Sequence, residues 1–448
     1  MKKLINIILF AIFINTIQLS VSANIIDRTI SKSEINKGAV SVSVRDTKNG
    51  QIIYALNDKT PKNPASTLKI ITLSAAVDTL GEDFEFSTEL YKNTNNELYL
   101  KLAGDPFFTS SNLNKLFQTA MSKKITEPKA IYIDDYVFND VEWGEGWQWD
   151  DDLNPLMPKF SSYNIDKNIL DIIITPTQNG APAEIHTGKF YPVTFMNLVT
   201  TGDRNQLEIA RNNSISPNII NLSGIVKKQI VKQIPINYPK RYFILRCEEA
   251  IKSSKMYYYG KFDQKKTPNK NIYLVDKITH PINMAIEDVL KRSNNLTAES
   301  IYKAAGAKFV KNTGSQENSE KMLNSYFDKT AINYDNIRVV DGSGVSKNNL
   351  LTSDFMSLFL VKNYANKTIV NSLPTAGEGT LSNRMLYFKD NIKAKTGTLA
   401  DVSAIAGYIT TRSGKVLAFD IMINDPKTKS ADKKTLEEYI LRDLYTNF

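Results

Sequence analysis

The sequence contains few of the residues that usually build catalytic and metal sites. Its 448 residues include one cysteine and two histidines. Cys247 has no partner for an internal disulfide, so packing must stabilise the fold, and we interpret this residue as a small buried hydrophobe. A Ser-His-Asp site would need His186 or His280, and a zinc site would need more His or Cys than the chain offers. A hydrolase built from this chain would therefore need a general base other than histidine.

Long apolar runs are equally scarce. One run of secretory length lies in residues 1–23, MKKLINIILFAIFINTIQLSVSA, which has two lysines, an apolar stretch and a small-residue V-S-A ending. We predict a signal peptide cleaved after Ala23, with a retained membrane anchor as the alternative. No later stretch has the roughly 18 apolar residues that a spanning helix needs. We therefore expect an exported protein that is soluble or peripherally attached to a membrane.

Charge of one sign is not concentrated anywhere in the chain. The formal net charge is +9, and it is spread without a run of five or six like charges. This diffuse excess suits contact with anionic polymers or membrane surfaces and does not indicate nucleic-acid binding. A hydrophobic content of 42% is sufficient for a packed core. The length favours more than one domain, or one domain with large insertions.

The first part of the chain predicts a hairpin followed by a helix. Residues 40–44 (VSVSV) alternate with period two, DTKNG turns the chain, and residues 51–57 run back. Pro64 and Ala65 then lead into a helix expected over about 67–80, which Gly81 ends. From about residue 84 to 281, strand-like stretches alternate with turns; they are residues 104–110, 130–138, 168–176, 188–196 and 271–279.

Helical periodicity resumes over residues 282–310, and an antiparallel meander is expected over residues 391–425. The last helix should place Leu436, Tyr439, Ile440 and Leu444 on one side. We therefore predict an α+β fold in which residues 24–85 and 276–448 form one discontinuous domain. Residues 86–275 would form a large β-rich insertion.

The stretch PASTLKIITL places a serine and a lysine three residues apart at the start of the first helix. Residues i and i+3 share a helix face, so the Lys69 ammonium can lie beside the Ser66 hydroxyl. A lysine desolvated in a pocket has a lowered pKa and can serve as the base for a serine nucleophile. The spacing alone is weak, because Ser300/Lys303 and Ser430/Lys433 repeat it; there the ordinary interpretation is a capped helix with a lysine that reaches water.

Two later elements supply what such a site would also need. KRSNNLTAES contains Ser293 and Asn295 at a helix break, and AKTGTLADVSAIAGY contains Lys395, Thr396 and Gly397 on a predicted strand. The lysine and threonine can bind a carboxylate, and the glycine lets a substrate backbone approach the strand edge. Ser-x-x-Lys, Ser-x-Asn and Lys-Thr-Gly together are the set used by penicillin-binding proteins and class A β-lactamases. Each motif has near-matches elsewhere in the chain, and their order and local structure distinguish these three.

The chain resembles the D-alanyl-D-alanine carboxypeptidase/endopeptidases of the low-molecular-mass class C penicillin-binding proteins. The resemblance covers most of the mature chain. It is carried by the blocks PASTLKIITLSAAVDTLGEDFEFSTEL, AGDPFFTS, GEGWQWDD, VVDGSGVSKNNLLT, LPTAGEGTL, AKTGTLADVSAIAGYIT and LRDLYTNF. It implies a penicillin-binding/β-lactamase-like serine transpeptidase domain, an antiparallel sheet flanked by helices, whose inserted region divides into two subdomains.

The resemblance also implies a role for each motif residue. Ser66 would be the acylated nucleophile, Lys69 its general base, and Ser293 the residue that passes a proton to the leaving D-alanine. The backbone N–H groups of Ser66 and Thr398 would form the oxyanion hole. Asn295 would hold the substrate amide.

The substrate carboxylate would be bound by Lys395 and Thr396, with Gly397 beside them on the same strand. Two auxiliary positions are implied less directly. An acidic residue after the Trp-x-Trp pair matches Asp151, although Asp150 and Asp152 are rivals. A basic residue after G-S-G-x-S matches Lys347, where the family often has arginine, so the bidentate fork is missing.

The implied function is a serine-type DD-peptidase of the periplasm that cleaves D-Ala-D-Ala termini, D-Ala cross-links or both in peptidoglycan peptides. The resemblance implies acylation by β-lactam antibiotics as inhibitors and no metal or other cofactor. Two alternatives remain: a β-lactamase-like hydrolase, and a cell-wall binding or scaffold protein with impaired catalysis. The sequence does not indicate an oligomeric state.

Overall fold

The computed structural model describes residues 25–211 and 216–448, so the predicted signal peptide lies outside the described residues. The chain forms two compact units. The first contains the described residues up to Thr79, with Asn283–Asn294 and Glu320–Phe448, and the second contains Leu80–Ile282 and Asn295–Ser319. The predicted domain boundaries, 24–85 with 276–448 and 86–275, stay a prediction. The compact units differ from them mainly in grouping Asn295–Ser319 with the second unit.

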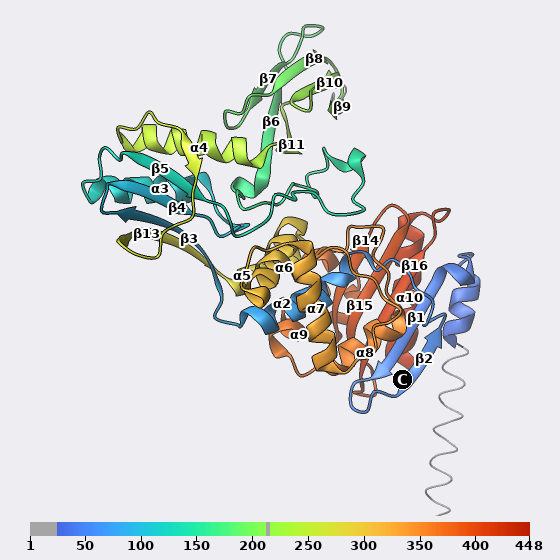
Figure 1. Cartoon of the computed structure of the whole chain (residues 1–448). Coiled ribbons are helices and arrows are strands. Elements are labelled where there is room, and N and C mark those ends of the chain that lie inside the picture. Colours follow the sequence, from blue (N-terminus) through green and yellow to red (C-terminus); the bar gives the residue numbers. More distant parts are fainter. Residues whose placement is uncertain (1–24, 212–215) are drawn as a thin grey trace, which may run out of the picture. The chain divides into compact units, whose positions relative to one another are not determined.

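The first unit is built on an antiparallel sheet of five strands in the order β14-β15-β16-β1-β2 (Figure 1). The hairpin expected near the N-terminus is present, since Val44 of β1 lies opposite Tyr54 of β2. The C-terminal meander is also present and supplies the other three strands. The strands are β1 (Val40–Asp46), β2 (Ile52–Leu56), β14 (Ile392–Thr398), β15 (Val402–Thr410) and β16 (Val416–Asn424).

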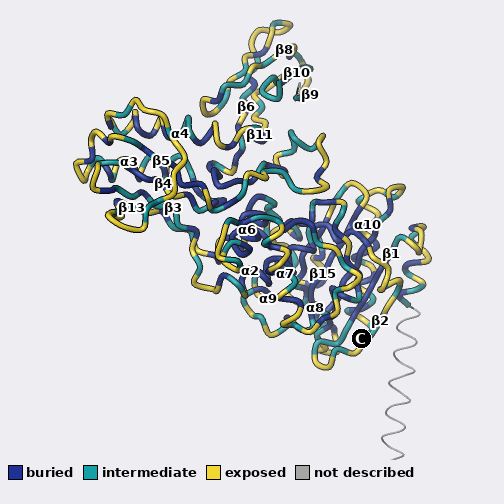
Figure 2. Tube along the Cα trace, in the orientation of Figure 1, coloured by how far each residue is buried: buried dark blue, intermediate teal, exposed yellow. Residues whose placement is uncertain are grey.

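Helices cover both faces of this sheet, which explains the alternation of β1. Its valines enter the core that β1, β14, β15 and β16 share with α10, while Ser41 and Ser43 face α8 and hydrogen-bond Ser353 and Ser357 at 2.6 and 2.8 Å. Figure 2 shows β15 in dark blue, in agreement with its burial. The helices around this sheet are α2 (Lys69–Leu80), α5 (Ile282–Lys291), α7 (Gln316–Thr330), α8 (Ser353–Asn363), α9 (Lys367–Ser372) and α10 (Ser430–Asn447).

The predicted apolar side of α10 needs one correction. Leu436, Ile440 and Leu444 are buried as expected, whereas Tyr439 is 50% exposed. At 100° per residue, position 439 lies at the edge of the stripe that the other three define. Leu441 is buried instead.

The described residues of the second unit form three sheets and three α-helices. The sheet orders are β12-β5-β4-β3-β13, β11-β6-β7 and β8-β10-β9. The strands are β3 (Glu85–Asn93), β4 (Glu97–Lys101), β5 (Ala130–Asp134), β6 (Ile169–Thr175), β7 (Glu184–Thr187), β8 (Thr194–Thr201), β9 (Gln206–Arg211), β10 (Ile219–Val226), β11 (Ile230–Pro235), β12 (Phe262–Gln264) and β13 (Ile272–Pro281). The helices are α3 (Ser110–Ser122), α4 (Pro239–Ser254) and α6 (Asn295–Val310). A β-rich region is confirmed. Helix α6 lies within the helical stretch predicted over residues 282–310, whereas α3 and α4 were not anticipated.

Two strand predictions in this unit were wrong in detail. Residues 104–110 form a loop that leads into α3, because the Thr109 hydroxyl accepts the N–H of Asn112 and caps the helix. Within residues 188–196 the strand begins only at Thr194, since Pro192 cannot donate to a β-ladder. Cys247 is fully buried in α4, as expected.

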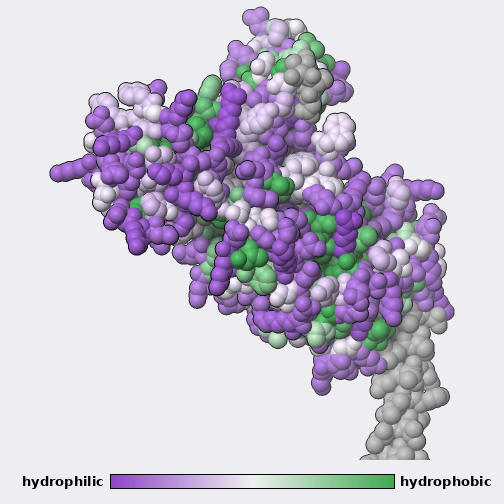
Figure 3. Space-filling view, viewed as in Figure 1, coloured by the Kyte–Doolittle hydropathy of each residue, from purple (hydrophilic) through white to green (hydrophobic). Residues whose placement is uncertain are grey.

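On the face shown in Figure 3 the surface is mostly hydrophilic, with hydrophobic residues in small areas. Within residues 25–211 and 216–448, no helix has both the length and the apolar character needed to cross a membrane.

Candidate active site

Ser66 lies in a short 3-10 helix, η2 (Ala65–Leu68), that runs directly into α2, so the helix predicted over about 67–80 is present. The Asn63 side chain accepts the N–H of Ala65 at 2.9 Å, and Ala65 has the unusual φ of +46° for a non-glycine residue. The turn holds Ser66 half-buried while its neighbours are buried.

Lys69 is fully buried and donates to the Ser66 Oγ at 2.9 Å. Its Nζ also donates to the carbonyl oxygen of Ser343 at 2.5 Å. That carbonyl belongs to a turn held by Asp341, a buried carboxylate that accepts the N–H groups of Gly344 and Ser346 at 2.7 Å each. The ammonium is therefore fixed against the serine from two sides.

Lys395 forms a second buried lysine–serine pair. It is fully buried on β14 and donates to the Ser293 Oγ at 2.8 Å and to the Thr396 carbonyl at 2.7 Å. Burial, and after it the positive charge of Lys69, hold the pKa of Lys395 well below its ordinary value. The site therefore disfavours two ammonium charges at once. Ser293 has a φ of +60°, so the chain turns sharply there.

β14 runs directly beside the turn that carries Ser66. A Cβ added to Gly397 would lie 2.8 Å from the Pro64 carbonyl oxygen and 2.9 Å from the Ser66 nitrogen, which no ordinary side chain tolerates. Thr396 is 8% exposed, and its hydroxyl donates to that of Thr380 at 2.8 Å. Thr398 ends the strand and is exposed.

A model of the D-Ala-D-Ala carboxypeptidase 3 (S13) family matches residues 22–442. The chain belongs to this family. It is 25% identical over 438 residues to D-alanyl-D-alanine carboxypeptidase DacB of Haemophilus influenzae, with 91% of each chain covered. It is 27% identical over 424 residues to D-alanyl-D-alanine carboxypeptidase of an Actinomadura species, covering 87% of this chain and 78% of that one.

The fold agrees with this assignment. The structure is similar to the crystal structure of penicillin binding protein 4 (dacB) from Haemophilus influenzae, with a TM-score of 0.83 and 25% identity, covering 94% of this chain and 99% of that one. The predicted fold class is therefore confirmed. As a member of the S13 family the protein is an enzyme, a serine DD-peptidase, and the predicted family resemblance is confirmed as well.

The other two Ser-x-x-Lys pairs of this S13 chain have a different geometry. Lys303 donates to the Asn139 side chain at 2.8 Å and to the Val141 carbonyl at 2.7 Å. Lys433 donates to the Asp401 and Asp425 carbonyls at 2.8 and 2.6 Å. In each pair the lysine is committed to other acceptors, whereas Lys69 contacts its own serine.

The other predicted site residues are Lys347, Asn295 and Asp151. Lys347 is on the surface, with its Nζ 4.0 Å from the Asp401 carboxylate. Asn295 begins α6 in the second unit, where its side chain donates to the Leu156 carbonyl at 2.8 Å. Asp151 is half-buried in a short 3-10 helix, η3 (Trp149–Asp151), of the second unit.

Asp152 pairs with Arg211 at 3.0 Å in the same unit, and this structural ion pair leaves Asp150 as the rival of Asp151. Both histidines also belong to the second unit. His280 lies 2.6 Å from Asp105 and His186 lies 3.6 Å from Glu184. Each imidazole therefore lies beside a carboxylate of its own unit.

Sequence reasoning missed the contact between Thr380 and Thr396, although it singled out LPTAGEGTL as a landmark block. It also missed the contact between Ser343, in the block VVDGSGVSKNNLLT, and Lys69. Both contacts join segments that are far apart in the chain, so no local spacing signals them.

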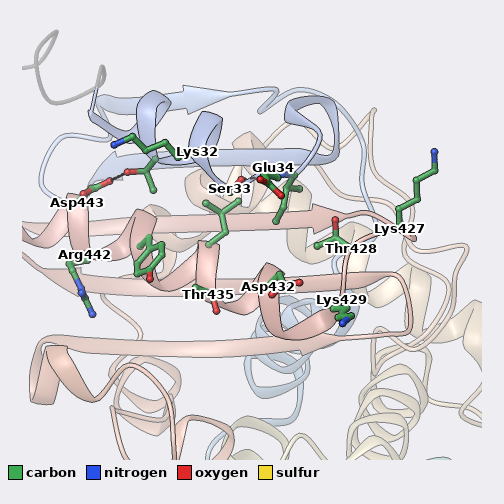
Figure 4. Close-up of a pocket in the computed structure, with 14 residues that line it drawn as sticks. Lys32, Ser33, Glu34, Lys427, Thr428, Lys429, Asp432, Thr435, Arg442 and Asp443 are labelled. Carbon is green, nitrogen blue, oxygen red and sulfur yellow. Dashed lines mark hydrogen bonds between the residues drawn. The ribbon is translucent and has the colours of Figure 1, made fainter.

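A cavity of about 800 Å³ lies away from these residues, between helical residues 25–32 and α10 (Figure 4). Its walls carry charges of both signs, including Lys32, Asp432 and Arg442, and it contains none of the predicted site residues. Throughout residues 25–211 and 216–448, no cluster of three or more His, Cys, Asp or Glu side chains could hold a metal ion.

Proposed function

We propose that this S13 enzyme hydrolyses the D-Ala-D-Ala termini of peptidoglycan stem peptides, and D-Ala cross-links, through an acyl-enzyme on Ser66. The observation that carries the proposal is the 2.9 Å hydrogen bond between the fully buried Lys69 and the Ser66 hydroxyl. A serine is a weak nucleophile until an adjacent base removes its proton. Lys69 is the base that the described geometry offers.

Acylation begins with Lys69 in its neutral form. Its amine takes the Ser66 hydroxyl proton as Oγ forms a bond to the carbonyl carbon of the penultimate D-alanine. Negative charge develops on the carbonyl oxygen, which the backbone N–H groups of Ser66 and Thr398 are positioned by the family pattern to receive. Burial and the charge of Lys69 lower the pKa of Lys395, so the pair disfavours two ammonium charges at once.

Collapse of this intermediate breaks the bond to the terminal D-alanine. The departing nitrogen needs a proton, which Ser293 supplies from its hydroxyl and regains from the protonated Lys69. The 2.8 Å bond from Lys395 holds the Ser293 oxygen in place. A water molecule then attacks the Ser66 ester while Lys69 takes its proton, and Lys69 returns that proton to the Ser66 Oγ as the shortened peptide leaves.

Binding of the substrate uses the residues around this centre. Lys395 and Thr396 attract the terminal carboxylate, and Gly397 lets the turn that carries Ser66 lie directly against β14. By the family pattern, Asn295 would hold the substrate amide. Asp151 would pair with the free ammonium of a diamino acid in the stem peptide, and Lys347 would supply a positive charge near the substrate.

The same centre would react with β-lactams, whose strained amide mimics the D-Ala-D-Ala bond but leaves a slowly hydrolysed ester. The similar Haemophilus influenzae protein carries penicillin binding in its name. We also propose that the protein is exported to the periplasm and that residues 1–23 are removed as a signal peptide. It would meet its substrate at the cell wall and attach peripherally to the membrane.

The test is D-alanine release from a D-Ala-D-Ala peptide, with cross-linked muropeptides as a second substrate. The purified protein should release D-alanine, and Ser66→Ala should abolish release. Ser430→Ala is a matched control, because Ser430 has the same Ser-x-x-Lys spacing, and its activity should equal that of the wild type.

The alternatives give different results in the same experiment. A β-lactamase-like hydrolase would turn over nitrocefin rapidly and leave the peptides intact. A scaffold protein would cleave neither the peptides nor nitrocefin. Activity that survives Ser66→Ala would contradict the proposed nucleophile.

A further inference from the structure

The segment from Pro374 to Leu381 runs along β14 and is attached to it on both sides of Lys395. The Pro374 carbonyl accepts the N–H of Ala394 at 3.0 Å. Six residues later, Thr380 meets the side chain of Thr396 with their hydroxyl oxygens 2.8 Å apart. The segment therefore has a fixed register against the strand that carries the candidate carboxylate-binding residues.

The same segment also braces the chain ahead of Ser293. Gly379 has a φ of +48°, and a Cβ there would lie 2.3 Å from the carbonyl oxygen of Lys291, so this close approach requires glycine. Glu378 lies 3.9 Å from the Lys291 ammonium. Within the segment, the N–H of Leu381 donates to the Glu378 carbonyl at 2.7 Å. One short turn thus contacts the Lys-Thr-Gly element and Lys291, two residues before Ser293.

We propose that Thr380 is a positioning residue that selects substrates with a free terminal carboxylate. A hydroxyl has one hydrogen to donate and lone pairs to accept two bonds. When no anion is bound, the Thr396 hydroxyl donates its hydrogen bond to the Thr380 hydroxyl. When a carboxylate arrives, Thr396 turns its hydrogen to the anion and Thr380 donates to the Thr396 oxygen. The two hydroxyls then form a chain that points at the carboxylate, and each bond in such a chain strengthens the next.

This role depends on the proposed function, because the carboxylate is that of the D-Ala-D-Ala substrate or of a β-lactam. It goes beyond the motif residues, since Thr380 lies in none of the three motifs. The environment of Thr380 supports the role. The residue is half-buried, at the end of a turn whose backbone is held by hydrogen bonds, so its hydroxyl is presented at a fixed position.

Thr380→Val tests the proposal, since valine keeps the shape and removes the hydroxyl. The second-order acylation rate with benzylpenicillin should fall about 3- to 10-fold, the loss expected for one hydrogen bond. With benzylpenicillin methyl ester, which lacks the anion, the variant and wild type should agree within about twofold. Hydrolysis of a D-Ala-D-Ala peptide should show a raised KM with kcat little changed, and Thr380→Ser should restore wild-type values.

Ser382→Ala, at an exposed hydroxyl just after the segment, is the matched control and should behave as wild type. Thermal unfolding of each variant checks the fold. Equal losses with the acid and the ester, or failure of Thr380→Ser to restore the rate, would overturn the positioning role. A wild type that benzylpenicillin does not label would instead overturn the proposed function, so the two failures are distinguishable.

Discussion

Replacing Asp341 by asparagine would change the turn that holds Lys69 and leave every predicted catalytic side chain in place. The Asp341 carboxylate is 1% exposed. One of its oxygens accepts the N–H of Gly344 at 2.7 Å and the Asn349 amide at 2.8 Å, and the other accepts the N–H of Ser346 at 2.7 Å. An amide keeps one acceptor oxygen and places an NH2 group against a donor at the second position.

The magnitude follows from these three bonds. A hydrogen bond to a charged group contributes about 1.5–3 kcal/mol and one between neutral groups about 0.5–1.5 kcal/mol, so each bond that survives is weakened by about 1 kcal/mol. A buried N–H left facing another donor costs about 1–3 kcal/mol more. Relief from burying a charge offsets part of this sum. We expect Asp341→Asn to lower the free energy of unfolding by about 2–4 kcal/mol.

The effect should extend to acylation, because the same turn presents the Ser343 carbonyl to Lys69 at 2.5 Å. We expect acylation by benzylpenicillin to slow by at least about 10-fold, because even a small displacement of a catalytic group lowers the reaction rate by that order. Urea unfolding followed by circular dichroism and a fluorescent-penicillin rate measure the two effects. Asp432→Asn, at an exposed first-turn aspartate of α10, is the control and should cost less than about 1 kcal/mol. Wild-type stability and rate in Asp341→Asn would refute this reasoning.

Three further predictions concern packing and pH. Gly397→Ala should lower stability by about 1–3 kcal/mol and slow acylation, because the new Cβ would lie 2.9 Å from the Ser66 nitrogen; thermal unfolding and penicillin labelling check this, and an unaffected variant would contradict it. Burial lowers the pKa of Lys303 to about 8, so the unfolded chain binds the extra proton between that value and the ordinary 10.5. The unfolding free energy of wild type minus that of Lys303→Met should therefore increase as pH rises from about 8 to 10.5. If this difference stays constant over the range, the lowered pKa of Lys303 is contradicted. The hydrogen bond that His280 donates to the Asp105 carboxylate raises the pKa of His280 above 6.5, so its stabilisation is complete below that pH and is lost as pH rises through the raised value. The difference in unfolding free energy between wild type and His280→Gln, measured by urea titration, should therefore become smaller as pH rises through the raised value, and a difference that grows would refute the assignment.

Much of the site could be predicted because its chemistry is local. The i, i+3 spacing of Ser66 and Lys69 brings their side chains together within one turn, and the structure places them 2.9 Å apart. Spacing alone could not separate them from Ser300 and Lys303, where the lysine turns to acceptors from other segments. Order along the chain and the neighbouring blocks made that distinction. The roles of the individual site residues remain predictions, which the experiments above test.

The contacts that the sequence could not predict are long-range. Ser343 is separated from Lys69 by 274 positions and Ser293 from Lys395 by 102, and no pattern of spacing encodes such pairs. In the second unit α4 was missed for another reason. Its buried residues Tyr242, Phe243, Arg246, Cys247, Ala250 and Ile251 follow helical spacing, and this signal was available but was masked by the surrounding strands.

The most direct test of the account is to map the site of covalent labelling by benzylpenicillin. The purified protein is incubated with the antibiotic, its intact mass is measured, and the labelled peptide is identified after digestion. The account predicts one adduct per chain, on the peptide that contains Ser66, and no adduct in Ser66→Ala. An adduct on another serine, or an equal adduct on Ser66→Ala, would contradict it.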